Sequence, residues 1–185
     1  DMGTVALNYA PGNTSITASD GSTASAGGSG TEISFKGNLG VDGLTVLLGQ
    51  ETISADTNGQ VTAATAEEVE KVAGFKYGQG AWAVGYTHRT FDDGTTSAIE
   101  NSIDTVTAIS ATYAISDSLS IGYENLTGEF ESSALKDEES DAITVGYNLG
   151  GLGVSVMYVE SDNIAGGNTA QDTQEELQIR TVYKF

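Results

Sequence analysis

Apolar and polar residues alternate along ten segments of the chain. Within each segment, apolar residues occupy one parity, and Gly, Ala, Ser, Thr, Asn or charged residues mostly occupy the other. Successive side chains of a β-strand point to opposite faces, so a period of two predicts ten strands with one apolar and one polar face. The segments lie near residues 5–9, 33–39, 44–48, 69–77, 82–86, 103–115, 119–123, 143–149, 152–158 and 177–185.

The connections between these segments are alternately short and long. Short turns are expected at residues 40–43, 78–80, 116–118 and 150–151, and long polar loops at 11–30, 55–66, 92–101, 131–139 and 161–173. The stretch TAEEVEK at 65–71 also has a helix-capping pattern, but we favour a strand that begins near Val69. That strand would direct Lys71 to the apolar parity, where snorkelling at an interface would make a charge tolerable.

Composition narrows the classes of protein that fit this pattern. Seven Lys and Arg against 26 Asp and Glu give a formal charge of -19, which disfavours binding to nucleic acid. The chain has no cysteine, so it cannot form a disulfide or a thiolate metal site. No run of eighteen apolar residues exists, which argues against a transmembrane helix. The 24 glycines and single proline suit many tight turns.

A bilayer explains both the alternation and the connections. Lipid cannot satisfy backbone polar groups, so a membrane-spanning sheet must close on itself, with short turns on the periplasmic end and long loops outside. The sequence therefore predicts an all-β fold, a transmembrane antiparallel up-and-down β-barrel, and a single domain over residues 1–185.

Three stretches carry a resemblance to a known family. The terminal LQIRTVYKF and the hairpins AISDSLSIGYE and AITVGYNLGGLGVSVMYVE resemble the general-diffusion porins of the outer membranes of Gram-negative alphaproteobacteria. The resemblance implies a water-filled channel for passive diffusion of small hydrophilic solutes and ions. It also implies location in the cell outer membrane, contact with lipid and lipopolysaccharide, and a homotrimer.

The same resemblance bears on assembly and on completeness. In the family, a last strand that ends in Phe is recognised by the barrel-assembly machinery, which assigns that role here to Tyr183 and Phe185. Family barrels have about sixteen strands, the number that leaves an aqueous channel. We therefore expect the ten strands here to be the C-terminal part of a longer barrel, with about six N-terminal strands missing.

Charged residues at the polar parity are the candidates for the channel wall. Cations on one wall that face acids on another produce a transverse field, which orients dipolar solutes. The position of any one of these charges is explained equally well by avoidance of lipid, because a charged side chain that faces lipid at mid-bilayer destabilises the protein by about 2–4 kcal/mol. The expected basic residues are Lys36, Lys76, Arg89, Arg180 and Lys184, and the expected acidic residues are Glu32, Glu51, Glu70, Asp104, Glu124 and Glu176.

Acidic clusters in the loops are candidate calcium ligands. Closely spaced carboxylates supply the hard oxygens that calcium prefers, and such ions would bridge lipopolysaccharide to the loops. No EF-hand spacing is present, and solvated loops explain the same clusters. No cofactor is expected to be required. The candidate residues are Asp92, Asp93, Asp137, Glu138 and Glu139.

Two other functions fit parts of the pattern. An omptin-like protease would be a ten-stranded barrel with a histidine and acids at its rim, but the single histidine, His88, falls at the apolar parity. The chain also has no Cys nucleophile or G-x-S-x-G elbow, so we expect no enzyme. A soluble secreted β-sandwich or adhesin would instead bury the apolar parity between two sheets.

Overall fold

A computed structural model describes residues 2–11, 29–54, 67–92, 103–167 and 173–183 of the chain. Within these residues, it contains ten β-strands and one short 3₁₀ helix. The strands are β1 Gly3–Ala10, β2 Gly30–Gly37, β3 Leu44–Ile53, β4 Glu68–Gln79, β5 Trp82–Asp92, β6 Ile103–Ala114, β7 Leu119–Phe130, β8 Glu138–Leu149, β9 Leu152–Asp162 and β10 Thr173–Tyr183, and the helix is η1 Ile164–Gly166.

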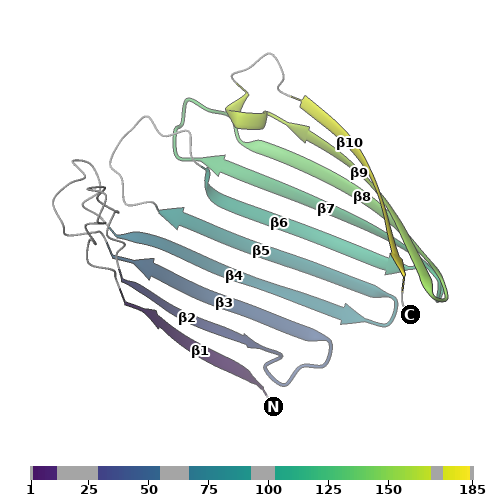
Figure 1. Ribbon diagram of the computed structural model, residues 1–185, viewed down its shortest axis with the longest axis horizontal. Coiled ribbons are helices and arrows are strands. Elements are labelled where there is room, and N and C mark those ends of the chain that lie inside the picture. The colour runs from purple at the N-terminus through teal and green to yellow at the C-terminus, as the bar shows by residue number, and fades with distance from the viewer. Residues whose placement is uncertain (1, 12–28, 55–66, 93–102, 168–172, 184–185) are drawn as a thin grey trace, which may run out of the picture.

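All ten strands belong to one antiparallel sheet in which their order in space is their order in sequence. Figure 1 shows a curved sheet with β1 at one edge and β10 at the other. The short turns lie along one margin, where β1 also begins and β10 ends, and the described connection between β7 and β8 lies along the opposite margin. The all-β fold with ten antiparallel strands, predicted from the alternation, is confirmed.

The cross-strand register divides the side chains into two faces. Residues directly opposite each other on neighbouring antiparallel strands point to the same side. One series of partners joins Phe75, Tyr86 and Ile109, and a second joins Lys76, Gly85 and Ser110. We call the first side the apolar face and the second the polar face.

The register confirms the predicted start of β4 and the face of Lys71, but not the predicted parity of Ile103. β4 begins at Glu68, next to the predicted start at Val69, and Lys71 lies on the apolar face between Gln50 and Thr90. Lys71 therefore has polar neighbours on both adjacent strands. The apolar parity predicted for Ile103 is wrong, because the register shifts between Ile103 and Thr105.

This shift is a β-bulge at the start of β6. Ile103 is opposite Phe130, and a Cβ placed on Gly128 of the polar face would lie 3.1 Å from the Ile103 side chain. Ile103 therefore points to the polar face. A bulge inserts one extra residue on its strand, so strict alternation fails there.

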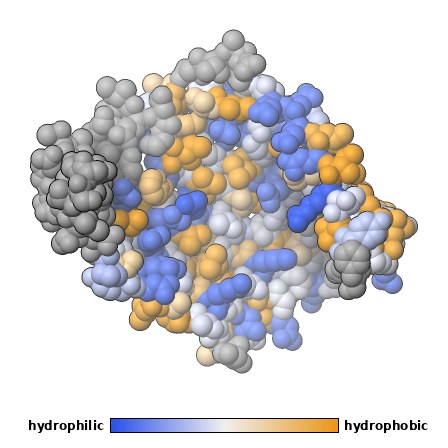
Figure 2. Space-filling model, viewed as in Figure 1, coloured by the Kyte–Doolittle hydropathy of each residue, from blue (hydrophilic) through white to orange (hydrophobic). Residues whose placement is uncertain are grey.

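The described residues contain no buried hydrophobic side chain. Most of the large apolar side chains that are exposed lie on the apolar face, such as Leu7, Ile109 and Ile143, which are 74%, 52% and 51% exposed. Figure 2 shows hydrophobic side chains at the surface among hydrophilic ones. No second layer of described strands covers the apolar face, because all ten strands form a single sheet. Among the described residues, no helix has the length and apolar character to cross a bilayer.

One turn glycine is fixed by close approach of two connections. Gly43 has a φ of +78°, which favours glycine, and its carbonyl oxygen accepts a 2.9 Å hydrogen bond from the Gly78 amide. A Cβ at this position would lie 2.0 Å from the Gly78 carbonyl oxygen. The turn that connects β2 and β3 is thereby held against the end of β4.

Candidate functional site: the polar face and its borders

The register places nine of the predicted wall residues on the polar face. They come from six of the ten strands, which shows that the polar parity continues across the sheet. Lys184 lies outside the described residues. The nine are Lys36, Lys76, Arg89, Arg180, Glu32, Glu51, Glu70, Glu124 and Glu176.

Three of the acids form a row across adjacent strands. Glu32 is directly opposite Glu51, which is directly opposite Glu70. Like charges in such pairs repel each other, so this row carries an electrostatic cost. The amide of Asn8 donates a 2.8 Å hydrogen bond to Glu32 at one end. Glu51 in the middle makes no hydrogen bond or ion pair with the described residues.

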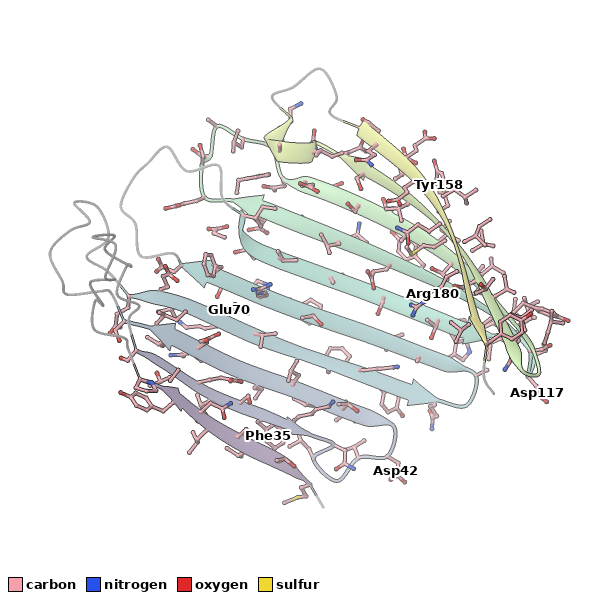
Figure 3. The ribbon with its side chains drawn as sticks, viewed as in Figure 1. Phe35, Asp42, Glu70, Asp117, Tyr158 and Arg180 are labelled. Atoms are coloured by element: carbon pink, nitrogen blue, oxygen red, sulfur yellow. The ribbon has the colours of Figure 1, made fainter. Side chains whose placement is uncertain are left out.

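Arg89 neutralises the other end of this acidic row. Its guanidinium lies 2.7 Å from the Glu70 carboxylate, and the two side chains are 52% and 31% exposed. Glu70 is opposite Phe91 and Arg89 is opposite Val72, so the pair is diagonal across β4 and β5. Figure 3 labels Glu70 near the long-loop end of β4. Water screens a pair this exposed, so its stabilising effect is about 1 kcal/mol or less.

A second row of cross-strand partners, near the middle of the sheet, has a charged residue at each end and two small residues between them. The cross-strand partners run from Lys76 through Gly85 and Ser110 to Glu124. These four residues also line a hollow of about 300 Å³ on the polar face. Glycine and serine leave room above the backbone, so the Lys76 and Glu124 side chains face an open space.

The bulge brings Asp104 to a hollow beside Arg89. A space of about 280 Å³ is lined by Arg89, Phe91, Ile103, Asp104 and Val106. The predicted inward residue Asp104 therefore lies near the basic group of the acidic row. Sequence alternation could not have located this hollow, because the bulge changes the direction of Ile103.

A further hollow of about 390 Å³ lies at the short-turn end of β6 to β10. Its floor follows one row of cross-strand partners from Ala114 through Ser120, Gly146 and Ser155 to Arg180. Figure 3 labels Arg180 on β10 and Asp117 in the short turn before β7. Arg180 was predicted as a wall residue from its charge and parity, whereas the polar parity of these small residues was their only signal in the sequence.

The apolar face has aromatic residues near both ends of its strands. Close to the short turns are Tyr77, Trp82, Tyr113, Tyr147 and Tyr183, and the ring centroids of Trp82 and Tyr113 are 4.4 Å apart. Aromatic side chains gather in this way at the two interfaces of a membrane barrel. Tyr183, predicted as part of an assembly signal, ends β10 opposite Leu152, and Phe185 lies outside the described residues.

Toward the long loops, the apolar face becomes polar at a defined level. In β5, β7 and β9, a tyrosine is followed two residues later by a polar side chain. The pairs are Tyr86 with His88, Tyr123 with Asn125, and Tyr158 with Glu160. The Tyr123 hydroxyl donates a hydrogen bond to the Asp141 carboxylate, which also accepts one of 3.1 Å from the Asn125 amide. The apolar band on this face is therefore bounded at both ends.

The calcium candidates do not come together on one face. Glu138 is opposite Gly128 of the polar face, and Glu139 is opposite Thr127 of the apolar face, so these two carboxylates point to opposite sides. Asp92 takes the apolar face opposite Val69. Asp137 precedes β8, where its carbonyl oxygen accepts a 3.1 Å hydrogen bond from Asn163, and Asp93 lies outside the described residues.

No group of three or more His, Asp or Glu side chains within the described ranges could hold a metal ion. Calcium binding stays a prediction. Glu138 and Glu139 point to opposite faces, so an ion on the surface of either face would be near only one of these two carboxylates.

His88 lies on the apolar face, as the alternation predicts. Its Nδ1 atom is 3.0 Å from the Thr107 hydroxyl on β6. An omptin-like site would require this histidine to meet a carboxylate, and within the described residues its hydrogen-bond partner is a hydroxyl group.

No family model matches this chain, and no curated protein matches it. Among solved structures, the chain is similar to the outer-membrane expressed OmpT of Vibrio cholerae, with a TM-score of 0.48 and 22% sequence identity. The similarity covers 72% of this chain and 45% of that chain, so the matched part is less than half of that protein. At this TM-score, the similarity by itself establishes neither a family nor an activity.

Proposed function

We propose that this chain forms part of the wall of an outer-membrane porin, a water-filled channel through which small hydrophilic solutes and ions diffuse passively. The observation that carries the proposal is that one sheet has two different faces and no buried hydrophobic side chain among its described residues. An exposed, continuous apolar face is stabilised by contact with lipid. Water is the partner that a face with nine charged side chains favours.

The dimensions of the apolar band support a membrane as that partner. On β8 the apolar positions run from Ile143 to Leu149, which is about 20 Å along a strand at roughly 3.4 Å per residue. Tyr147 lies near one end of this span and Tyr123 is level with Ile143 at the other, and membrane barrels have an apolar band about 25 Å tall between aromatic girdles. A soluble β-sandwich fits less well, because no second sheet of described strands covers this face.

The open edges of the sheet support a barrel that is longer than ten strands. β1 pairs with β2 and β10 pairs with β9, and no pairing joins β1 to β10 among the described residues. An unpaired strand edge in lipid leaves backbone groups without partners, and further strands between β1 and β10 would supply those partners. We infer that about six more strands do so, as in barrels of sixteen strands.

Assembly and partners follow from the same proposal. Tyr183 and Phe185 would be recognised by the barrel-assembly machinery, and the finished barrel would form a homotrimer in contact with lipopolysaccharide. Calcium bound by the loops would strengthen that contact. No catalytic activity is proposed.

The test is conductance of the full-length protein after reconstitution into planar bilayers. We expect stable, stepwise conductance in KCl and permeability of reconstituted vesicles to small sugars but not to large dextrans. A full-length, folded protein that produces neither would overturn the proposal. Gel filtration with light scattering in detergent tests the trimer separately, because a monomeric channel would contradict only the oligomeric state.

A further inference from the structure

The hollow at the short-turn end of the polar face lies beside a basic side chain without a protein partner. Arg180 makes no hydrogen bond or ion pair with the described residues. It differs in this respect from Arg89, whose guanidinium is 2.7 Å from Glu70. Within the described residues, the charge of Arg180 is therefore available to a ligand.

The row of residues beside Arg180 leaves space for such a ligand. Its direct neighbour across β9 is Ser155, followed by Gly146 on β8 and Ser120 on β7. These side chains are short, so the guanidinium can extend over them into the hollow of about 390 Å³. A Cβ on Gly146 would lie 2.9 Å from the Ser120 hydroxyl oxygen, so a larger residue there would crowd the floor.

The polar groups around the hollow suit a small anion. Ser120, Ser155 and Ser118 carry hydroxyl groups that can donate hydrogen bonds, and the guanidinium offers paired donors that match the two oxygens of a carboxylate or phosphate. Asp117 is the other charged residue that lines the hollow. It lies in the turn at the rim, so it would repel an anion at the entrance but does not lie in the row beside Arg180.

We propose that Arg180, Ser155 and Ser120 form a weak subsite for solutes that carry a carboxylate or a phosphate group, on the channel wall near its short-turn mouth. This inference rests on the proposed channel function, since it requires the polar face to be wet. The short-turn end is the periplasmic end in outer-membrane barrels. The subsite would therefore hold anionic solutes as they leave the channel.

The experiment uses inorganic phosphate as the probe and the full-length protein in planar bilayers. Conductance is first recorded in KCl, and phosphate is then added to either side. We expect phosphate to interrupt the current, and Arg180→Gln to raise the half-effective phosphate concentration about tenfold through loss of charge-assisted hydrogen bonds. Arg180→Lys keeps the charge but loses the paired donors. Its half-effective phosphate concentration should therefore lie between those of wild type and Arg180→Gln. An equal phosphate response in wild type and Arg180→Gln would overturn the subsite.

A matched control separates local binding from the general field of the channel. Arg89→Gln removes the same charge from the same face, but far from the hollow, and should leave the phosphate response within about twofold of wild type. If Arg89→Gln weakens the response as much as Arg180→Gln, phosphate is responding to overall charge and the subsite is wrong. Thermal unfolding followed by circular dichroism confirms that both variants fold.

A second measurement keeps the two proposals distinguishable. Broadening of the ³¹P resonance of phosphate reports binding to the detergent-solubilised full-length protein and does not depend on conductance. KCl conductance with no Arg180-dependent broadening would leave the channel intact and overturn the subsite. Absence of KCl conductance would instead overturn the channel function, and with it the proposed role of the subsite in transport.

Discussion

The two faces of the sheet use the same strands but differ in their side chains and in their tolerance of charge. On β8, Ile143, Val145 and Tyr147 take the apolar face, while Ala142, Thr144 and Gly146 take the polar face. The backbone hydrogen bonds are common to both sides. The two faces therefore differ in side-chain character alone, and neither encloses buried apolar side chains among the described residues.

The apolar side chains of the described sheet are not buried against one another. A soluble protein gains most of its stability by burying apolar side chains against one another. Here Ile143 and Val145 are 51% and 43% exposed. Lipid would supply the missing contacts on one side, and on the other side glycine, serine and threonine leave space for water beside the charged side chains.

The largest loss of stability is expected when a charge is placed on the apolar face and not on the polar face of one strand. Val145→Arg should lower the free energy of unfolding by about 2–4 kcal/mol, because it places a charge in the middle of the apolar band. Thr144→Arg, one residue away on the polar face, should cost less than about 1 kcal/mol. Urea unfolding of the full-length protein in lipid vesicles measures both. Equal losses would mean that the two faces have the same surroundings.

A smaller effect is expected at the turn between β2 and β3, which lies against the end of β4. Gly43→Ala should destabilise the protein by about 2 kcal/mol, because alanine there is strained at positive φ and its Cβ would lie 2.0 Å from the Gly78 carbonyl oxygen.

Gly40→Ala is the matched control for this turn. Gly40 has a similar φ of +76°, but no atom lies within 4 Å of the position of its Cβ. It should therefore lose only about 1 kcal/mol. Thermal unfolding distinguishes the two variants. Similar losses would show that backbone strain alone, and not the contact with β4, governs this turn.

The smallest expected effect concerns the charges within the polar face. Glu51→Gln removes the central charge of the row formed by Glu32, Glu51 and Glu70, and should stabilise the protein by about 0.5 kcal/mol at low salt. The gain should shrink at high salt, where screening already weakens the repulsion.

Glu176→Gln is the control for this row, because its direct partner across β9 is Val159. It should change the unfolding free energy by less than Glu51→Gln does. The reversal potential in a KCl gradient should also shift toward lower cation preference in Glu51→Gln. A destabilised Glu51→Gln variant would contradict the idea that the row is under electrostatic strain.

Local alternation was sufficient to predict the ten strands, the division into short and long connections, and the face taken by most residues. The prediction that β4 begins near Val69 was accurate, because the period of two continues through that segment despite its capping pattern. These features depend on the direction of successive side chains, which is fixed by the geometry of a single strand.

What the tertiary structure decided depends on contacts between strands. The register placed Glu32, Glu51 and Glu70 in one row, brought Arg89 to Glu70, and aligned Ser120, Gly146 and Ser155 beside Arg180. It also revealed the bulge that turns Ile103 to the polar face. The face of a side chain follows from its position along the strand, because the pleat repeats every two residues. Only the structure decided its neighbours, because register joins residues that are distant along the chain.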